Sequence, residues 1–150
     1  MTASQIVLLV LGILAFQIAI WVVVLRWLRR VTTRQQSEFK AELAATGERV
    51  LLGPEPAIYR GASSGLGLPR ARGNGVAALT DRRLIIRKLV GAAAEIPIAD
   101  VVGVRTDKWF QGGWTGGRLH VIVKLRSGGE VGLFVANSDA WVAALQKLAS

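Results

Sequence analysis

Residues 118–149 read RLHVIVKLRSGGEVGLFVANSDAWVAALQKLA. The spacing between apolar residues changes within this stretch, from every second residue to helical spacing. Apolar residues alternate with other residues along 118–126 and again along 130–136, with a Ser-Gly-Gly turn between the two runs, which predicts an antiparallel hairpin. From residue 137 onward, apolar residues recur at helical spacing behind an Asn that can cap a helix. The apolar face of this helix carries Trp141, Leu145 and Leu148. The end of the chain is therefore predicted to be two strands followed by an amphipathic helix.

Short β-rich runs separated by turn residues also occupy the sequence before this stretch. The predicted strands there are 49–52, 57–60, 76–80, 83–88, 95–98 and 101–106. Gly53-Pro54-Glu55-Pro56 is expected to separate the first two, and Pro97 places residues 95–98 at a sheet edge. Because no helix alternates with these strands, a parallel nucleotide-binding sheet is excluded. We expect residues 49–150 to form a small antiparallel barrel or sandwich of about seven strands, with the C-terminal helix closing one open end.

Three short motifs in this region are similar to those of a known fold family. Residues 75–86 read GVAALTDRRLII, residues 96–101 read IPIADV, and residues 139–145 read DAWVAAL. These motifs resemble the central hairpin, the following strand and turn, and the capping helix of pleckstrin-homology-like (PH/GRAM) domains, specifically of bacterial, actinobacterial-type membrane-anchored PH-like proteins. The resemblance implies a PH-like barrel with a tethering or binding role. It implies no catalytic residues.

Residues 6–25 form an apolar run that one strongly polar residue, Gln17, interrupts. A helix of this length spans roughly 30 Å, the hydrocarbon thickness of a bilayer. The charged residues that follow form a one-sided basic cluster of Arg26, Arg29, Arg30 and Arg34. Positive flanks stay cytoplasmic, so we expect residues 1–28 to be a single-pass cell-membrane anchor with the N-terminus outside. A cleaved signal peptide is the alternative, and it fits less well because a basic leader and a small-residue cleavage site are missing.

Residues 29–48 are polar and have helix-forming composition. Phe39 and Leu43 fall four residues apart on one helical face, and Gly47 is a plausible stop. We therefore expect a juxtamembrane helical linker that continues the anchor, ends near Thr46, and leads into the domain of residues 49–150.

Basic side chains near one hairpin are the first candidates for binding. Arg70 and Arg72 lie in a Gly-rich loop at 61–75, and the hairpin that follows carries more basic residues. Guanidinium groups suit bidentate contact with phosphate oxygens. The candidate patch for an anionic ligand consists of Arg70, Arg72, Arg82, Arg83, Arg87 and Lys88. A solvated loop beside an ordinary charged strand face is the alternative interpretation.

Aromatic side chains in a second loop are the other candidates. Residues 108–114 read KWFQGGW, which places Trp109, Phe110 and Trp114 in a Gly-rich segment. Exposed aromatics of this kind enter a membrane interface or contact a protein partner. Alternatively, they fold back and fill the barrel.

The composition excludes much chemistry. The chain has no Cys and one His, His120, so disulfides, thiol nucleophiles and cysteine-ligated metals are excluded. Asp100 and Asp107 have no partner base, and we expect no enzyme, no catalytic residue, no metal and no cofactor. The net charge of +9 points toward nucleic acid, but the basic residues are scattered, so no nucleic-acid partner is expected. His120 is expected to be a half-exposed structural residue.

Together these features predict a non-catalytic binding or scaffolding module that sits at the cytoplasmic side of the membrane and recruits a protein partner. One alternative is a sensor of anionic lipid head groups. Another is an accessory subunit of a membrane transport or envelope complex. A compact Arg cluster around Arg70 would favour lipid, whereas a neutral apolar groove would favour protein.

Overall fold

The computed structural model describes residues 2–114 and 116–149. The chain divides into two compact units, Met1–Arg34 and Gln35–Ser150. The helices are α1 (Ala3–Thr46) and α2 (Ser138–Ala149), with a 3-10 turn η1 (Ile98–Asp100). The strands are β1 (Val50–Ala62), β2 (Gly73–Thr80), β3 (Arg83–Lys88), β4 (Ala94–Pro97), β5 (Val101–Asp107), β6 (Trp109–Phe110), β7 (Gly113–Trp114), β8 (His120–Leu125) and β9 (Glu130–Val135).

Helix α1 is long and apolar enough to cross a membrane. Its most apolar window has a mean hydropathy of 2.9, and none of that window is buried. An N-terminal signal sequence also meets this criterion of length and apolar composition. The helix ends at Thr46, as its composition predicted, and Gly47 follows with a φ of 71°, a left-handed conformation that suits a helix stop.

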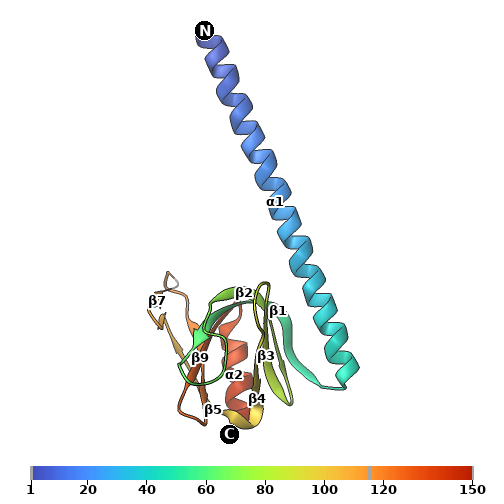
Figure 1. Ribbon diagram of the computed structural model, residues 1–150, viewed down its shortest axis with the longest axis vertical. Coiled ribbons are helices and arrows are strands. Elements are labelled where there is room, and N and C mark those ends of the chain that lie inside the picture. Colours follow the sequence, from blue (N-terminus) through green and yellow to red (C-terminus); the bar gives the residue numbers. More distant parts are fainter. Residues whose placement is uncertain (1, 115, 150) are drawn as a thin grey trace. The chain divides into compact units, whose positions relative to one another are not determined.

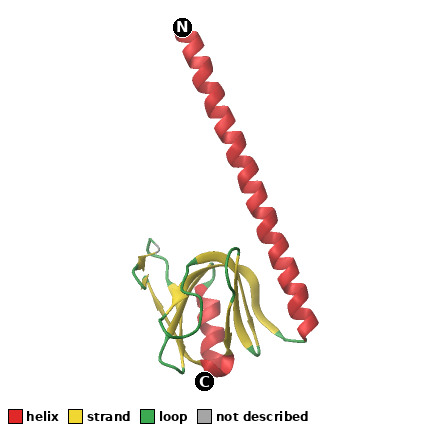
Figure 2. Cartoon of the chain, viewed as in Figure 1, coloured by secondary structure: helices red, strands yellow, loops and turns green. Residues whose placement is uncertain are grey.

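An antiparallel sheet of seven strands forms most of the second unit, in the order β4-β3-β2-β1-β9-β8-β5. Figure 2 shows the strands of this unit curving around its helix. The predicted hairpins 76–88 and 118–136 and the C-terminal helix are present, and β4 lies at an edge as Pro97 indicated. Asn137 caps α2, because its Oδ1 accepts a hydrogen bond from Ala140 N at 3.2 Å. Strands β6 and β7 pair only with each other and form a separate small hairpin.

Two predictions about the sheet are wrong. Residues 53–56 do not separate two strands, because β1 continues through them with irregular pairing between Leu52 and Glu55. Gly53 makes this path possible: its φ is 79°, and a Cβ there would overlap the carbonyl oxygen of Ala77. The sheet also does not close into a barrel, because its edge strands β4 and β5 pair with β3 and β8 and not with each other.

The core lies on the inner face of this curved sheet, where α2 packs (Figure 1). Trp141 and Leu145 are fully buried among alternate residues of the strands. Trp141 Nε1 donates to Glu55 Oε1 at 2.6 Å and thereby ties α2 to the irregular part of β1. The amphipathic helix therefore seals the inner face of the open sheet.

The end of α1 that belongs to the second unit covers the outer face of β2 and β3. Phe39 and Leu43 are both 1% exposed and pack with three outward residues of these strands, Val76, Ala78 and Ile85. The i, i+4 pair noted in the sequence is therefore the contact face of this helical segment.

The motif at residues 75–86 has a structural explanation. A Cβ on Gly75 would overlap the Arg87 carbonyl oxygen, so the two strands can approach closely only with Gly there. Thr80 Oγ1 accepts from Arg83 N at 3.0 Å and donates to Glu48 Oε2 at 2.7 Å. Arg83 Nη2 in turn lies 2.7 Å from Glu48 Oε1, so the turn and the start of the domain are held together.

Candidate functional site

Two tryptophans on the β6–β7 hairpin form an exposed aromatic surface. Trp109 and Trp114 face each other across the hairpin, with ring centroids 6.2 Å apart and planes inclined by 26°. They are 59% and 58% exposed. Offset stacking of this kind stabilises the pair and keeps both rings in a defined position. The hairpin thus presents a preformed apolar surface.

Phe110, between them in sequence, anchors the hairpin on the outer face of the main sheet. Its side chain is 4% exposed, and a Cβ built on Gly132 of β9 would overlap its ring. The absence of a side chain at Gly132 therefore makes the space that the ring fills. Of the two fates considered for the aromatic loop, Phe110 folds back on the sheet, whereas both tryptophans remain exposed.

His120 lies beneath this hairpin, 6.3 Å from the Phe110 ring, and is fully buried rather than half-exposed as expected. Its Nδ1 lies 3.1 Å from the carbonyl oxygen of Asp107, which can only accept, so Nδ1 carries the proton. Burial, together with the positive charges of Arg60 and Arg72, lowers the pKa of His120. The hairpin therefore rests on a neutral imidazole at neutral pH.

Two arginines reach the hairpin from the main sheet. Arg72, at the end of the β1–β2 loop, donates from Nη2 to the carbonyl oxygen of Gln111 at 2.5 Å. Arg60, on the outer face of β1, places its guanidinium against Gly113, and its buried Nε has no hydrogen-bond partner among the described residues. The structure therefore brings one predicted anion-binding residue to the predicted aromatics.

The remaining basic residues do not gather into one patch. Arg83 pairs with Glu48 and with Glu95, the latter at 3.0 Å. Arg87 pairs with Glu42 at 2.8 Å and lies 4.5 Å from the centroid of the Phe39 ring.

Lys88 points to the inner side of the sheet, where it donates to the Ala71 carbonyl oxygen at 3.1 Å. Of the six candidate basic residues, Arg70 and Arg82 are exposed, and their side chains form no ion pair within the part of the chain that the structure describes. Three of the six predicted residues thus have partners elsewhere in the domain, away from the hairpin.

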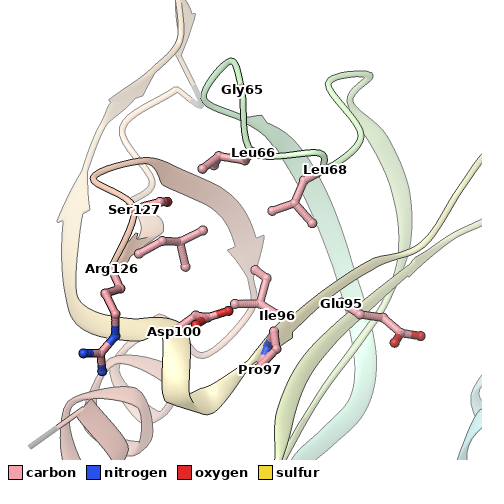
Figure 3. A pocket seen from close by; sticks show the side chains of 10 residues that line it. Gly65, Leu66, Leu68, Glu95, Ile96, Pro97, Asp100, Arg126 and Ser127 are labelled. Atoms are coloured by element: carbon pink, nitrogen blue, oxygen red, sulfur yellow. The ribbon is translucent and has the colours of Figure 1, made fainter.

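An apolar hollow of about 470 Å³ opens between the edge strand β4 and the β8–β9 turn. Leu66 and Leu68 of the β1–β2 loop and Ile96 of β4 point into it, whereas the charged ends of Glu95 and Arg126 turn away (Figure 3). Arg126 Nη2 donates to the Ala99 carbonyl oxygen, and Glu95 pairs with Arg83. Asp100 also lines the hollow, and its carboxylate lies beside Ile96 (Figure 3), so the surface combines apolar with acidic side chains and is not basic.

Sequence reasoning missed Arg60 and the burial of His120. Alternation along 57–60 places Arg60 on the outer face of the sheet, but nothing local indicates that the hairpin folds back onto that face. Among the described residues, no group of three or more His, Cys, Asp or Glu side chains could hold a metal ion. What this region offers chemically is an apolar aromatic surface beside two guanidinium groups.

Comparison with known proteins adds a fold likeness. No protein family and no curated protein match the chain. The crystal structure of the C-terminal domain of an unknown protein from Leishmania infantum is similar, with a TM-score of 0.51 and 16% sequence identity. The match covers 75% of this chain and 94% of that chain. At this identity the likeness concerns the fold alone.

Proposed function

We propose that the protein is a membrane-tethered, non-catalytic PH-like module that recruits a protein partner at the cytoplasmic side. The apolar part of α1 supplies the anchor, and the basic residues that follow it favour cytoplasmic placement of the second unit. A bent antiparallel sheet with a C-terminal helix on its inner face supports the PH-like assignment.

The observation that carries this proposal is the stacked, exposed pair of Trp109 and Trp114. Tryptophan is enriched among the residues that dominate protein–protein binding energy. Rings that are already fixed lose little conformational freedom on binding, so more of their contact energy contributes to affinity. Phe110 supplies this rigidity by fixing the hairpin on the sheet.

A protein partner is favoured over anionic lipid by the state of the basic residues. Recognition of anionic lipid by a surface usually needs clusters of about 4–8 basic residues. Here Arg83 and Arg87 are neutralised by acidic partners, and Lys88 points inward. The hollow beside β4 is apolar rather than basic, which also suits a protein. If the partner belongs to a membrane transport or envelope complex, this chain would be an accessory subunit of that complex.

A lipid sensor is the second candidate, because exposed tryptophans also enter membrane interfaces. Site-specific photo-crosslinking separates the two. A benzoylphenylalanine introduced at Trp114 in the full chain, in native membranes, should give a discrete protein adduct. The matched control is the same probe at Val90, which is 86% exposed and remote in sequence from the hairpin. Lipid adducts at position 114 without a protein adduct would refute the protein-partner proposal and favour the lipid sensor.

The orientation has its own test. A reporter fused after residue 150 should behave as cytoplasmic if the basic cluster sets the topology. Activity of the fusion only in the exported compartment would refute the cytoplasmic placement.

A further inference from the structure

Arg60 and Arg72 converge on one backbone position, Gly113 of the β6–β7 hairpin. A Cβ built on Gly113 would overlap Arg60 Nη2 and would lie 3.1 Å from Arg72 Nη1. The two guanidinium groups therefore lie against the same backbone position. Arg60 reaches it from the end of β1, and Arg72 reaches it from the end of the β1–β2 loop.

No acidic side chain neutralises this pair within residues 2–114 and 116–149. Arg83, Arg87 and Arg105 each pair with a carboxylate, whereas no ion pair involves Arg60 or Arg72. Asp107 is the acidic residue that most closely precedes the β6–β7 hairpin in the sequence. Its carboxylate pairs with Arg105 and accepts a hydrogen bond from the backbone N of Trp109. Arg60 is moreover half-buried, with its Nε shielded from solvent and unpartnered.

Two adjacent, unneutralised guanidinium groups repel each other, and burial of one of them adds a desolvation cost. Both effects lower the pKa of Arg60, burial being the larger. An incoming anion would relieve both, and guanidinium groups match the planar geometry of a carboxylate. The site adjoins the exposed Trp109–Trp114 pair along the chain, because Gly113 directly precedes Trp114 in the hairpin.

We propose that Arg60 and Arg72 form a clamp for a carboxylate of an acidic segment in the protein partner, whose adjoining apolar residue contacts the tryptophans. This inference rests on the proposed function, because it names the chemistry of the partner. A protein carboxylate fits better than a membrane, since the clamp is a single local site and not a broad basic face.

The first test repeats the crosslinking from position 114 in full-length variants. Arg60→Gln and Arg72→Gln should each reduce the protein adduct by about tenfold or more, because each removes one of the two charges that hold the carboxylate. Arg60→Lys, which keeps the charge and loses the planar fork, should restore it in part. Arg82→Gln removes the same charge from an exposed turn and should leave the adduct unchanged. Gly113→Ala, which alters no charge, should weaken it by displacing both guanidinium groups.

The second test needs no partner. The full chain in neutral detergent micelles is titrated with a capped hexaglutamate peptide while the Nε–Hε signals of the arginines are followed by NMR. Arg60 and Arg72 should shift, Arg82 should not, and a hexaglutamine peptide should shift none of them.

The outcomes distinguish the two ideas. A protein adduct that survives Arg60→Gln and Arg72→Gln overturns the clamp and leaves the proposed function standing. Absence of any protein adduct refutes the proposed function, and the peptide titration then decides on the clamp alone. Shifts caused by vesicles of anionic lipid but not by the acidic peptide would overturn the clamp in favour of a membrane ligand.

Discussion

Replacing Trp141 by alanine tests whether α2 seals the open sheet. The indole ring is fully buried among residues of the inner face, so its loss leaves a cavity that costs about 3–5 kcal/mol of unfolding free energy. The substitution also removes the 2.6 Å hydrogen bond to Glu55, and stranding this partly buried carboxylate adds about 1 kcal/mol. We therefore expect a total loss of about 4–6 kcal/mol, a large share of the stability of a typical domain.

Trp141→Phe separates these two contributions. Most of the buried ring is kept and the hydrogen bond is lost, so the cost should fall to about 1.5–3 kcal/mol. The assay is urea unfolding of the full chain in nonionic detergent, followed by circular dichroism because the variants change the fluorescence. Glu55→Gln serves as a control that keeps the packing and weakens only the polar contact. A loss below about 1 kcal/mol for Trp141→Ala would refute the argument that α2 closes the inner face.

The other predictions concern the outer face. Phe110→Ala should release the hairpin and abolish the stacking of the tryptophans while costing at most about 3–5 kcal/mol; Gly132→Val should do the same by filling the ring's space, and near-UV circular dichroism reports the loss. His120 has a lowered pKa in the folded protein, so the unfolded chain binds the proton first and the unfolding free energy should fall as pH drops below about 7. A His120→Gln variant should show a flatter pH profile over the same range, and an unchanged profile would refute the assignment. Glu48→Gln should cost about 1.5–3 kcal/mol in urea unfolding, since Arg83 loses its most buried partner.

The spacing of apolar residues along the sequence was sufficient to predict most of the strands and helices. Alternation over 118–136 and the change to helical spacing at Asn137 depend on neighbours in sequence, and the structure reproduces both. The edge position of β4 also followed from a local property, because Pro97 lacks the N–H that a central strand would donate.

What could not be predicted depends on segments that meet only in the folded chain. Alternation placed His120 on the polar outer face, and it also left Ile122 there, yet both are fully buried because the β6–β7 hairpin covers that face. The space for Phe110 exists only because Gly132 lies opposite it, and no pattern within either segment indicates this pairing. Likewise, Arg60 became a candidate only when Gly113 was found beside it. The prediction of a closed barrel was wrong for a similar reason: closure requires the edge strands β4 and β5 to pair, and no local pattern tells whether they meet.

The covering of the outer face strengthens the functional argument for the tryptophans. The outward apolar residues of β2 and β3 are covered by Phe39 and Leu43, and the Phe110 ring fills the space over Gly132 of β9. In the described part of the second unit, the large apolar side chains left exposed are Val90, Val102, Trp109, Trp114 and Leu119. Single exposed aliphatic residues are common on protein surfaces, but two stacked tryptophans form a contiguous patch of the kind that marks an interaction site. Among these exposed side chains, only Trp109 and Trp114 stack on each other, and this contiguous aromatic patch is the feature on which the proposed partner binding rests.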